Sequence, residues 1–322
     1  EIRADVKKIM PEARSVITCG LNYNTGYPYS TEVKEKNSGW IARYAWGDDY
    51  HDIIHDKLRK LSEFIEEHTD GRARTRSYVD TGPVLERALA KYGGIGWIGK
   101  NTCLINQKIG SWLFLSEIIT DLELEYDTEA LYRCGTCSRC IDASPTDALP
   151  RPYELDSRLC ISYLTIELKN SIPFELRESI ENNIFGCDIC QDVCPWNNRA
   201  DVSGIKGFQP REGLFNPELS QMALEEESFR RVFRGSPVKR SKRRGFLRNV
   251  LIAMGNSGDE GFLTIIRKCL QDEEPLVRAH AAWALWKIQG GEASEALREL
   301  LFTELDETVI AELENILSII ER

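Results

Sequence analysis

The chain has 322 residues, of which 42% are hydrophobic and 29% are charged, and its formal net charge is -10. That length allows two or three domains. No stretch approaches the roughly 18 apolar residues of a membrane span, and no signal peptide is predicted at the start. We therefore expect a cytoplasmic protein without a membrane anchor. Its acidic composition disfavours non-specific nucleic-acid binding, although a local basic patch can still bind RNA.

Residues 1–127 predict a mixed α/β domain. Two apolar runs have the composition of β-strands, and a segment between them repeats apolar residues at the spacings of three and four that are typical of an amphipathic helix. A further segment predicts a second helix with a proline in its first turn. In chain order these elements are Ser15–Leu21, the helix Tyr50–His68, the helix Thr81–Tyr92 with Pro83, and Trp112–Ile119.

Residues 128–205 contain seven of the ten cysteines, in two closely spaced runs. In the bacterial ferredoxin pattern C-x2-C-x2-C-x3-C-P, three cysteines surround one cubane and the fourth binds the other cluster. In a large chain without a signal peptide, such clustering indicates metal ligation in a reducing compartment rather than disulfides. The spacing predicts a ferredoxin-like module with two 4Fe–4S clusters. The runs are Cys134, Cys137, Cys140 and Ser144, and Cys187, Cys190 and Cys194, with Cys160 between them.

The ferredoxin pattern predicts a crossed set of ligands. A serine oxygen binds iron less favourably than a thiolate, so we expect cluster two to be altered, labile or missing. Structural zinc is the alternative, because paired C-x2-C motifs bind zinc well, but three cysteines in each run fit two cubanes better. Cys19, Cys103 and Cys269 lie outside the runs, and we expect small buried apolar side chains there. Cluster one would use Cys134, Cys137, Cys140 and Cys194, and cluster two would use Cys160, Cys187, Cys190 and Ser144.

From residue 206 onward the sequence has helical periodicity. Leu247–Met254 and Val277–Leu285 resemble two copies of one helix, each with an arginine near its start. A repeat of this period is typical of HEAT-type α-solenoids. A plain helical bundle is the alternative.

A basic segment begins before the first of these helices. In an acidic protein it predicts contacts with the phosphate backbone of a folded RNA, with strongly salt-dependent binding. The alternative is a solvated flank of a helix. Its cations are Lys239, Arg240, Lys242, Arg243, Arg244 and Arg248.

Several further segments are distinctive. They are RYAWGDDYH at 43–51, VDTGPVLER at 79–87, GIGWIGKN at 94–101, RLCISYLTIE at 158–167, GCDICQDVCPWN at 186–197, and 243–256. Together with the cysteines, they resemble the epoxyqueuosine reductase family of cobalamin-dependent enzymes of tRNA queuosine synthesis. The resemblance extends over essentially the whole chain, with the motifs in the same order.

The resemblance implies an α/β N-terminal corrinoid-binding domain (1–127), a ferredoxin-like two-cluster module (128–205) and C-terminal α-helical HEAT-like repeats that bind tRNA (206–322). It implies a monomeric enzyme that reduces epoxyqueuosine to queuosine at the wobble position of tRNA. Cobalamin would lie between the first domain and the clusters, which reduce it with electrons from an external donor. A corrinoid reductive dehalogenase would not need the basic segment, and a non-catalytic electron-transfer protein would leave residues 1–127 without a role.

The resemblance also implies site residues. Asp80 would be the general acid, with its pKa raised by a desolvated site, although on the residues alone it could be a helix N-cap. No Asp-x-His-x-x-Gly motif is present, so we expect no histidine to ligate cobalt. His51 and His55 could bind zinc, but a surface role is favoured. The cofactor contacts would be Arg3, Arg43, Asp80, Lys100, Cys103, Asn106 and Ser162, and the tRNA contacts Lys239, Arg240, Lys242, Arg243 and Arg244.

Overall fold

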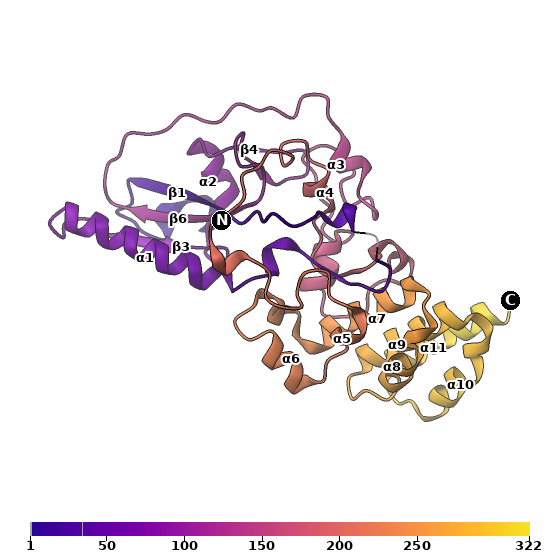
Figure 1. The fold of residues 1–322 in the computed structure, drawn as a ribbon. Helices are drawn as coiled ribbons and strands as arrows, with labels where there is room; N and C mark the ends of the chain where they lie inside the picture. The colour runs from indigo at the N-terminus through magenta and orange to yellow at the C-terminus, as the bar shows by residue number, and fades with distance from the viewer. Residues whose placement is uncertain (1, 34) are drawn as a thin grey trace.

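The computed structural model describes residues 2–33 and 35–322. A lobe built on a small β-sheet lies at one end, loops that carry the cysteines lie in the middle, and helices occupy the C-terminal end (Figure 1). No helix in the described part of the chain is long and apolar enough to cross a membrane.

The sheet at the N-terminal end has three antiparallel strands in the order β1-β6-β3. Helix α1 covers one face, where Ile54 and Leu58 pack against Phe114 and Ile118. The other face packs against the segment that leads into α2. The bounds are β1 Ser15–Asn22, α1 Tyr50–His68, β3 Thr75–Tyr78, α2 Glu86–Tyr92 and β6 Leu113–Thr120. The predicted strands and first helix are confirmed, because their apolar periodicity matches the faces that they bury.

The second predicted helix begins later than expected. Helix α2 starts at Glu86 and its N-cap is Leu85, so Pro83 precedes the helix, and the interpretation of Asp80 as an N-cap is wrong. Asp80 has a φ of 54° in the left-handed region. A Cβ atom on Gly82 would lie 2.6 Å from the Tyr78 ring. The loop therefore folds back against β3, and this close approach requires glycine.

Short elements surround the cysteines. A parallel pair joins β2 to β7, and an antiparallel hairpin joins β4 to β5. One turn of helix lies within each cysteine run, and a π-helix follows Cys160. The bounds are β2 Trp40–Ile41, β4 Trp97–Ile98, β5 Leu104–Ile105, α3 Arg139–Asp142, the π-helix Tyr163–Glu167, β7 Asn183–Phe185 and α4 Ile189–Asp192.

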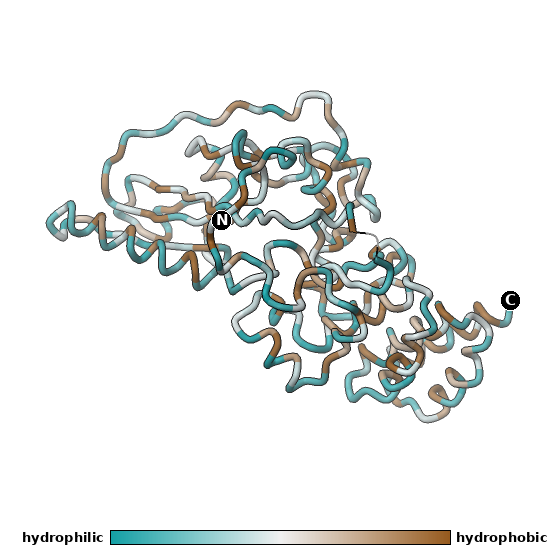
Figure 2. The backbone as a smooth tube through the Cα atoms, in the orientation of Figure 1, coloured by the Kyte–Doolittle hydropathy of each residue, from teal (hydrophilic) through white to brown (hydrophobic). Residues whose placement is uncertain are grey.

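The C-terminal end consists of helices in which hydrophobic and hydrophilic residues alternate along the chain (Figure 2). The two similar segments of the sequence form α7 and α9. These helices approach closely, because a Cβ atom on Gly255 would lie 2.6 Å from the Trp283 ring. The bounds are α5 Leu219–Met222, α6 Glu226–Val232, α7 Lys242–Ser257, α8 Leu263–Cys269, α9 Pro275–Gln289, α10 Ser294–Thr303 and α11 Glu307–Ile320.

One hydrophobic core joins all three parts of the chain. It combines Trp40 and Trp46 with Leu164 of the cysteine region and with residues of α7 and α9. Arg248 lies fully buried in this core and donates hydrogen bonds to the carbonyls of Leu164, Leu168 and Asn170. Its inclusion among the surface cations is therefore wrong, because its guanidinium joins α7 to the cysteine region.

Candidate active site

Asp80 lies in the loop after β3, with its side chain 49% exposed. Its Oδ2 atom accepts a hydrogen bond from the Tyr50 hydroxyl at 2.9 Å and lies 3.4 Å from His51 Nε2. Its backbone N–H donates to Glu86 Oε1 at 2.5 Å. The first turns of α1 and α2 therefore hold the carboxylate and the backbone of Asp80 from two directions.

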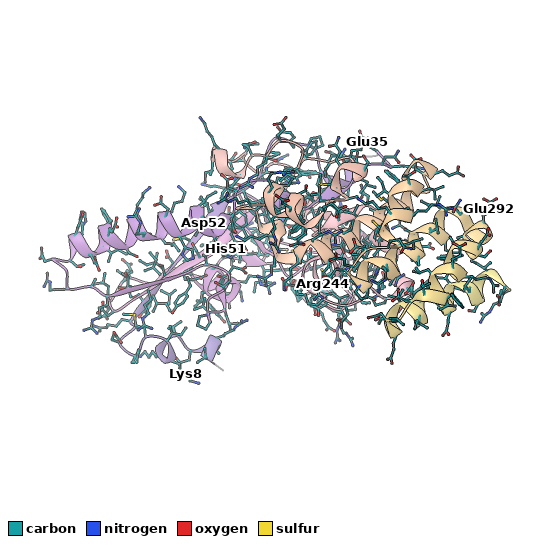
Figure 3. The ribbon with its side chains drawn as sticks, turned by 90° about the horizontal axis from the view of Figure 1, so that it is seen from below. Lys8, Glu35, His51, Asp52, Arg244 and Glu292 are labelled. Carbon is teal, nitrogen blue, oxygen red and sulfur yellow. The ribbon has the colours of Figure 1, made fainter. Side chains whose placement is uncertain are left out.

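His51 lies between two carboxylates. Asp49 caps α1 and its Oδ1 atom lies 2.8 Å from His51 Nδ1, while Asp49 Oδ2 accepts from Lys239 Nζ at 2.8 Å. The Asp49 carboxylate and then Asp80 raise the pKa of His51 to about 9. His51 is therefore protonated at neutral pH. The His51 side chain is 26% exposed, and Figure 3 places His51 where the sheet lobe meets the rest of the molecule.

The pKa of Asp80 differs from the expectation. His51 chiefly lowers the pKa of Asp80 below its ordinary value, and the Tyr50 hydroxyl acts in the same direction against partial burial. The expected increase is therefore wrong for this structure, because the neighbouring imidazolium stabilises the carboxylate more than desolvation destabilises it. The proton of this pair is held on His51.

A chain of contacts leads from Asp80 to the second cysteine run. Arg87 follows Glu86 and donates from Nη1 to the Thr102 carbonyl at 2.5 Å. Asn101 donates to the Cys190 carbonyl at 3.3 Å and accepts from the Cys103 N–H at 3.2 Å. The Cys103 and Cys190 thiols lie near enough to shift each other's pKa, that of Cys103 downward and that of Cys190 upward. The turn between β4 and β5 thus bridges α2 and the cysteines, with Thr102 in a left-handed conformation at a φ of 64°.

The four cysteines of the predicted cluster one line one cavity of about 720 Å³. The indole of Trp97 donates to Cys134 Sγ at 3.5 Å, and Lys100 Nζ donates to the Cys137 carbonyl at 2.8 Å. Lys100 therefore lies at this cavity, and its contact with a corrinoid stays a prediction. The cavity cysteines are Cys134, Cys137, Cys140 and Cys194.

Cys160, Cys187 and Cys190 lie near enough to affect one another electrostatically, and burial raises the pKa of the Cys187 thiol. Ser162 Oγ donates to the Cys187 carbonyl at 3.4 Å. Ser144 Oγ accepts from the Ala148 N–H at 3.1 Å, so its hydroxyl holds a local turn. Two residues later, Thr146 Oγ1 donates to the Leu159 carbonyl at 2.6 Å, beside Cys160.

In the described part of the chain, no three His, Cys, Asp or Glu side chains converge on a position for a single metal ion. A cubane makes a different geometric demand, because its four ligands bind four separate iron atoms.

Three other expected cofactor contacts lie elsewhere. Arg43 is 1% exposed, and its guanidinium donates to the Thr25, Tyr27 and Pro28 carbonyls, so the assignment of Arg43 to the cofactor is wrong. The Asn106 side-chain amide donates to the Ile95 carbonyl and accepts from the backbone N–H groups of Lys108 and Ile109. Its hydrogen bonds are therefore made within the protein. Arg3 lies exposed in the 3-10 helix Ile2–Ala4.

The basic segment borders a groove of about 1220 Å³ beside α6, α7 and α8. Lys239 and Arg240 pair with Asp49 and Glu167 but remain more than half exposed. Lys242 and Arg244 also line the groove, and Figure 3 shows Arg244 on the same side of the molecule as His51.

Arg243 has a different role from its neighbours. Both terminal nitrogens of its guanidinium contact the Asp272 carboxylate, and its Nε donates to the Leu224 carbonyl. The side chain is 11% exposed. The assignment of Arg243 to a phosphate contact is therefore wrong, because its charge is neutralised inside the protein.

Known families and proteins match all three parts of the chain. "Epoxyqueuosine reductase QueG, DUF1730" matches residues 3–81, a 4Fe–4S double cluster binding domain matches 133–197, and HEAT repeats match 240–318. The second match favours iron–sulfur over zinc, and the third favours HEAT repeats over a plain bundle.

The epoxyqueuosine reductase of Xanthomonas campestris pv. campestris is 43% identical over 289 residues, which are 88% of this chain and 81% of that protein. A solved epoxyqueuosine reductase with an epoxyqueuosine-modified tRNA-Tyr stem loop has a TM-score of 0.90 and 32% identity, covering 98% of this chain and 84% of that one. The Bacillus subtilis structure, solved with an aspartate-containing catalytic loop swung out of its active site, has a TM-score of 0.90 and 31% identity, covering 98% and 85%. This chain belongs to the epoxyqueuosine reductase family.

Proposed function

We propose that this chain reduces the epoxide of epoxyqueuosine in tRNA to the alkene of queuosine by means of a cobalamin bound between Asp80 and the second cysteine run. The observation that carries this proposal is the Asp80–His51 pair, which the Arg87–Thr102 contact links to the loop touching Cys190. A proton source and an electron-carrying module thus lie at opposite ends of one short path. The Bacillus subtilis relative, whose catalytic loop is named for an aspartate, supports a catalytic role for the Asp80 loop.

The residues along this path suit a flat, amide-edged macrocycle. Leu85 and Tyr163 are 46% and 37% exposed. Leu85 precedes Glu86, and Tyr163 follows Ser162, whose hydroxyl donates to the Cys187 carbonyl. Arg87 and Ser162 supply polar groups at the same places. When bound, a corrinoid would supply a strong carbon nucleophile and a carrier that collects single electrons from the clusters.

The reaction consumes two electrons and two protons and releases the epoxide oxygen as water. Asp80, which is ionised at rest, would first receive a proton from the His51 imidazolium 3.4 Å away and then pass it to the leaving oxygen. His51 would take up the second proton from water, and the same route would deliver it. Asp49 orients the imidazole from its other nitrogen, and Glu86 holds the backbone of Asp80. A bound cofactor and base would remove water from Asp80, which raises its pKa and favours this transfer.

The two proposed clusters would occupy different places in the cysteine region. Cys134, Cys137, Cys140 and Cys194 would hold cluster one in the surface cavity. Cys160, Cys187, Cys190 and Ser144 would hold cluster two, next to the loop that contains Cys103. The cysteines of cluster one would thus lie on the side open to an external donor and those of cluster two on the side of the corrinoid site, and the bound clusters would supply single electrons. Ser144 is the weakest of these ligands, so cluster two would be the more labile.

The groove beside α7 would hold the tRNA backbone. Lys239 joins the two sites, because it lines the groove and pairs with Asp49 of the proton-supplying group. A backbone bound along Lys239, Arg240, Lys242 and Arg244 would bring an anticodon base toward Asp80. The tRNA stem loop in a solved relative supports this partner. Since one chain supplies every residue of this site, we propose a monomer that acts on cytoplasmic tRNA.

The test uses the anaerobically purified chain, loaded with iron, sulfide and cobalamin, and an epoxyqueuosine-modified tRNA stem loop. With dithionite as reductant, we expect a cobalamin absorption spectrum that remains after gel filtration and conversion of the nucleoside to queuosine, measured by mass spectrometry. A chain that converts the substrate equally well without cobalamin would contradict the proposal.

A further inference from the structure

The cavity of cluster one has an unusual charge for this protein. The chain carries a formal net charge of -10, yet the only ionisable side chains besides cysteine that line this cavity are basic. They are Lys100, Arg133, Arg139 and Arg199. A positive opening in a negative molecule focuses the field at one place on the surface.

Three of these cations are available to a partner. Arg133, Arg139 and Arg199 are exposed, and none of them forms an ion pair within the described residues. Other exposed arginines of the chain, such as Arg59 and Arg298, pair with a nearby carboxylate. Lys100 points inward and donates to the Cys137 carbonyl. The three arginines therefore present uncompensated charge around the cavity.

Exposed apolar side chains lie beside the arginines. Leu131 is 74% exposed, and Tyr132 and Tyr153 are 46% and 49% exposed. The two tyrosine rings meet edge to face at 5.7 Å, next to Cys134, and the Tyr153 N–H donates to the Lys100 carbonyl. Leu131 and Tyr132 belong to the segment between β6 and α3, which arches over one side of the molecule (Figure 1). A small apolar patch with a charged border is suited to a transient protein contact.

We propose that these six residues, the cluster-one surface, dock a small acidic electron-carrier protein that reduces cluster one. The inference rests on the proposed role of the clusters as the electron supply of the active site. In each encounter one electron passes from the reduced cofactor of the carrier to cluster one, so the carrier is oxidised and the cluster reduced. Two encounters supply the electrons for one epoxide. The cluster-one surface comprises Leu131, Tyr132, Arg133, Arg139, Tyr153 and Arg199.

The same cations could act differently, by offsetting the negative charge of a thiolate-ligated cluster. That role would affect reduction by every donor, whereas docking affects only a protein donor. The two roles are therefore separable with a protein reductant and a small one.

The test measures reduction of the clusters by stopped-flow absorption in the fully loaded chain. Reduced flavodoxin, an acidic flavoprotein, serves as the protein donor and dithionite as the small one. The variant combines Arg133→Glu, Arg139→Glu and Arg199→Glu, and Arg72→Glu is the matched control, because Arg72 is 81% exposed on the sheet lobe beyond α1. We expect flavodoxin to reduce the triple variant at least about tenfold more slowly at low salt. We expect this difference to shrink between about 50 and 200 mM salt, and the control to match the original chain.

Dithionite should reduce all three proteins at equal rates. The three proteins should also contain equal amounts of iron. Equal flavodoxin rates for the triple variant and the original chain would overturn the docking role, as would an equal loss with dithionite. A variant that lost tRNA affinity but kept its flavodoxin rate would show that RNA binds here instead. Failure of the original chain to convert epoxyqueuosine with dithionite would count against the proposed function, while the stopped-flow comparison would still decide the docking role.

Discussion

His51 Nε2 lies 3.4 Å from Asp80 Oδ2, and this contact joins the first turn of α1 to the loop after β3. The left-handed backbone of Asp80 turns its side chain toward the helix, and Asp49 holds the imidazole from behind. In the proposed reaction, His51 would store the proton and Asp80 would deliver it. The pair can serve a base-sized substrate because Asp80 remains half exposed.

Replacement of the Asp80 carboxylate should separate binding from turnover. Asp80→Asn keeps the shape and the Tyr50 hydrogen bond but cannot pass on a proton. We expect epoxide reduction to fall about 100-fold or more, while retention of cobalamin and affinity for the tRNA stem loop change little. Single-turnover conversion and gel filtration measure these effects. Asp52→Asn is the control, because Asp52 is an exposed carboxylate on α1, next to His51. Full activity of Asp80→Asn would refute the acid role.

The pH dependence should reflect His51. Its pKa is raised to about 9 in the folded chain, above the ordinary value of about 6.5. Its contribution to stability is therefore complete below about pH 6.5 and is lost as the pH rises through about 9. Single-turnover rates should decline over the same alkaline range. His51→Gln should abolish this dependence of both the melting temperature and the rate, and an unchanged alkaline profile in that variant would contradict the assignment.

Replacing Ser144, the weakest proposed ligand of cluster two, by cysteine should stabilise that cluster. Ser144→Cys supplies a thiolate where the ferredoxin pattern has one. We expect the reconstituted variant to hold about eight iron atoms per chain, and its absorption near the visible cluster band to fade more slowly in air. Ser318→Cys adds an exposed thiol on α11 and should change neither property. If Ser144→Cys and the original chain hold the same iron and fade equally fast, Ser144 is not the limiting ligand.

The basic segment should divide into structural and RNA-binding residues. Arg243→Met leaves Asp272 without its partner in a nearly buried site, so we expect a loss of stability of about 3 kcal/mol. Lys242→Ala with Arg244→Ala should leave the melting temperature nearly unchanged and weaken tRNA binding, with the logarithmic salt slope reduced by about two. Thermal unfolding and binding at several salt concentrations separate the two classes. A salt slope that the double variant leaves unchanged would exclude these contacts.

Much of the local structure could be predicted from the sequence. Tyr50–His68 forms α1 with the expected bounds, and the apolar runs around Cys19 and Phe114 form β1 and β6. In each case the spacing of the apolar residues matches the face that the helix or strand buries. This spacing depends only on residues that are close together in the sequence. The start of α2 was missed because a proline can stand either in a helix or just before one, and the packing of Gly82 against Tyr78 decides between them.

The sequence by itself determined the three-part plan, the cysteine set with its gap at Ser144, and the family. Such features depend on residue identity and spacing along the chain. Only the tertiary structure decided how each charge is used. Arg43, Arg243 and Arg248 donate hydrogen bonds to partners inside the protein, His51 contacts Asp80, and Lys100 lines the cavity that contains Cys137. The partners of these groups come from distant segments, and the free energy of a charge depends on those neighbours and on its exposure to water.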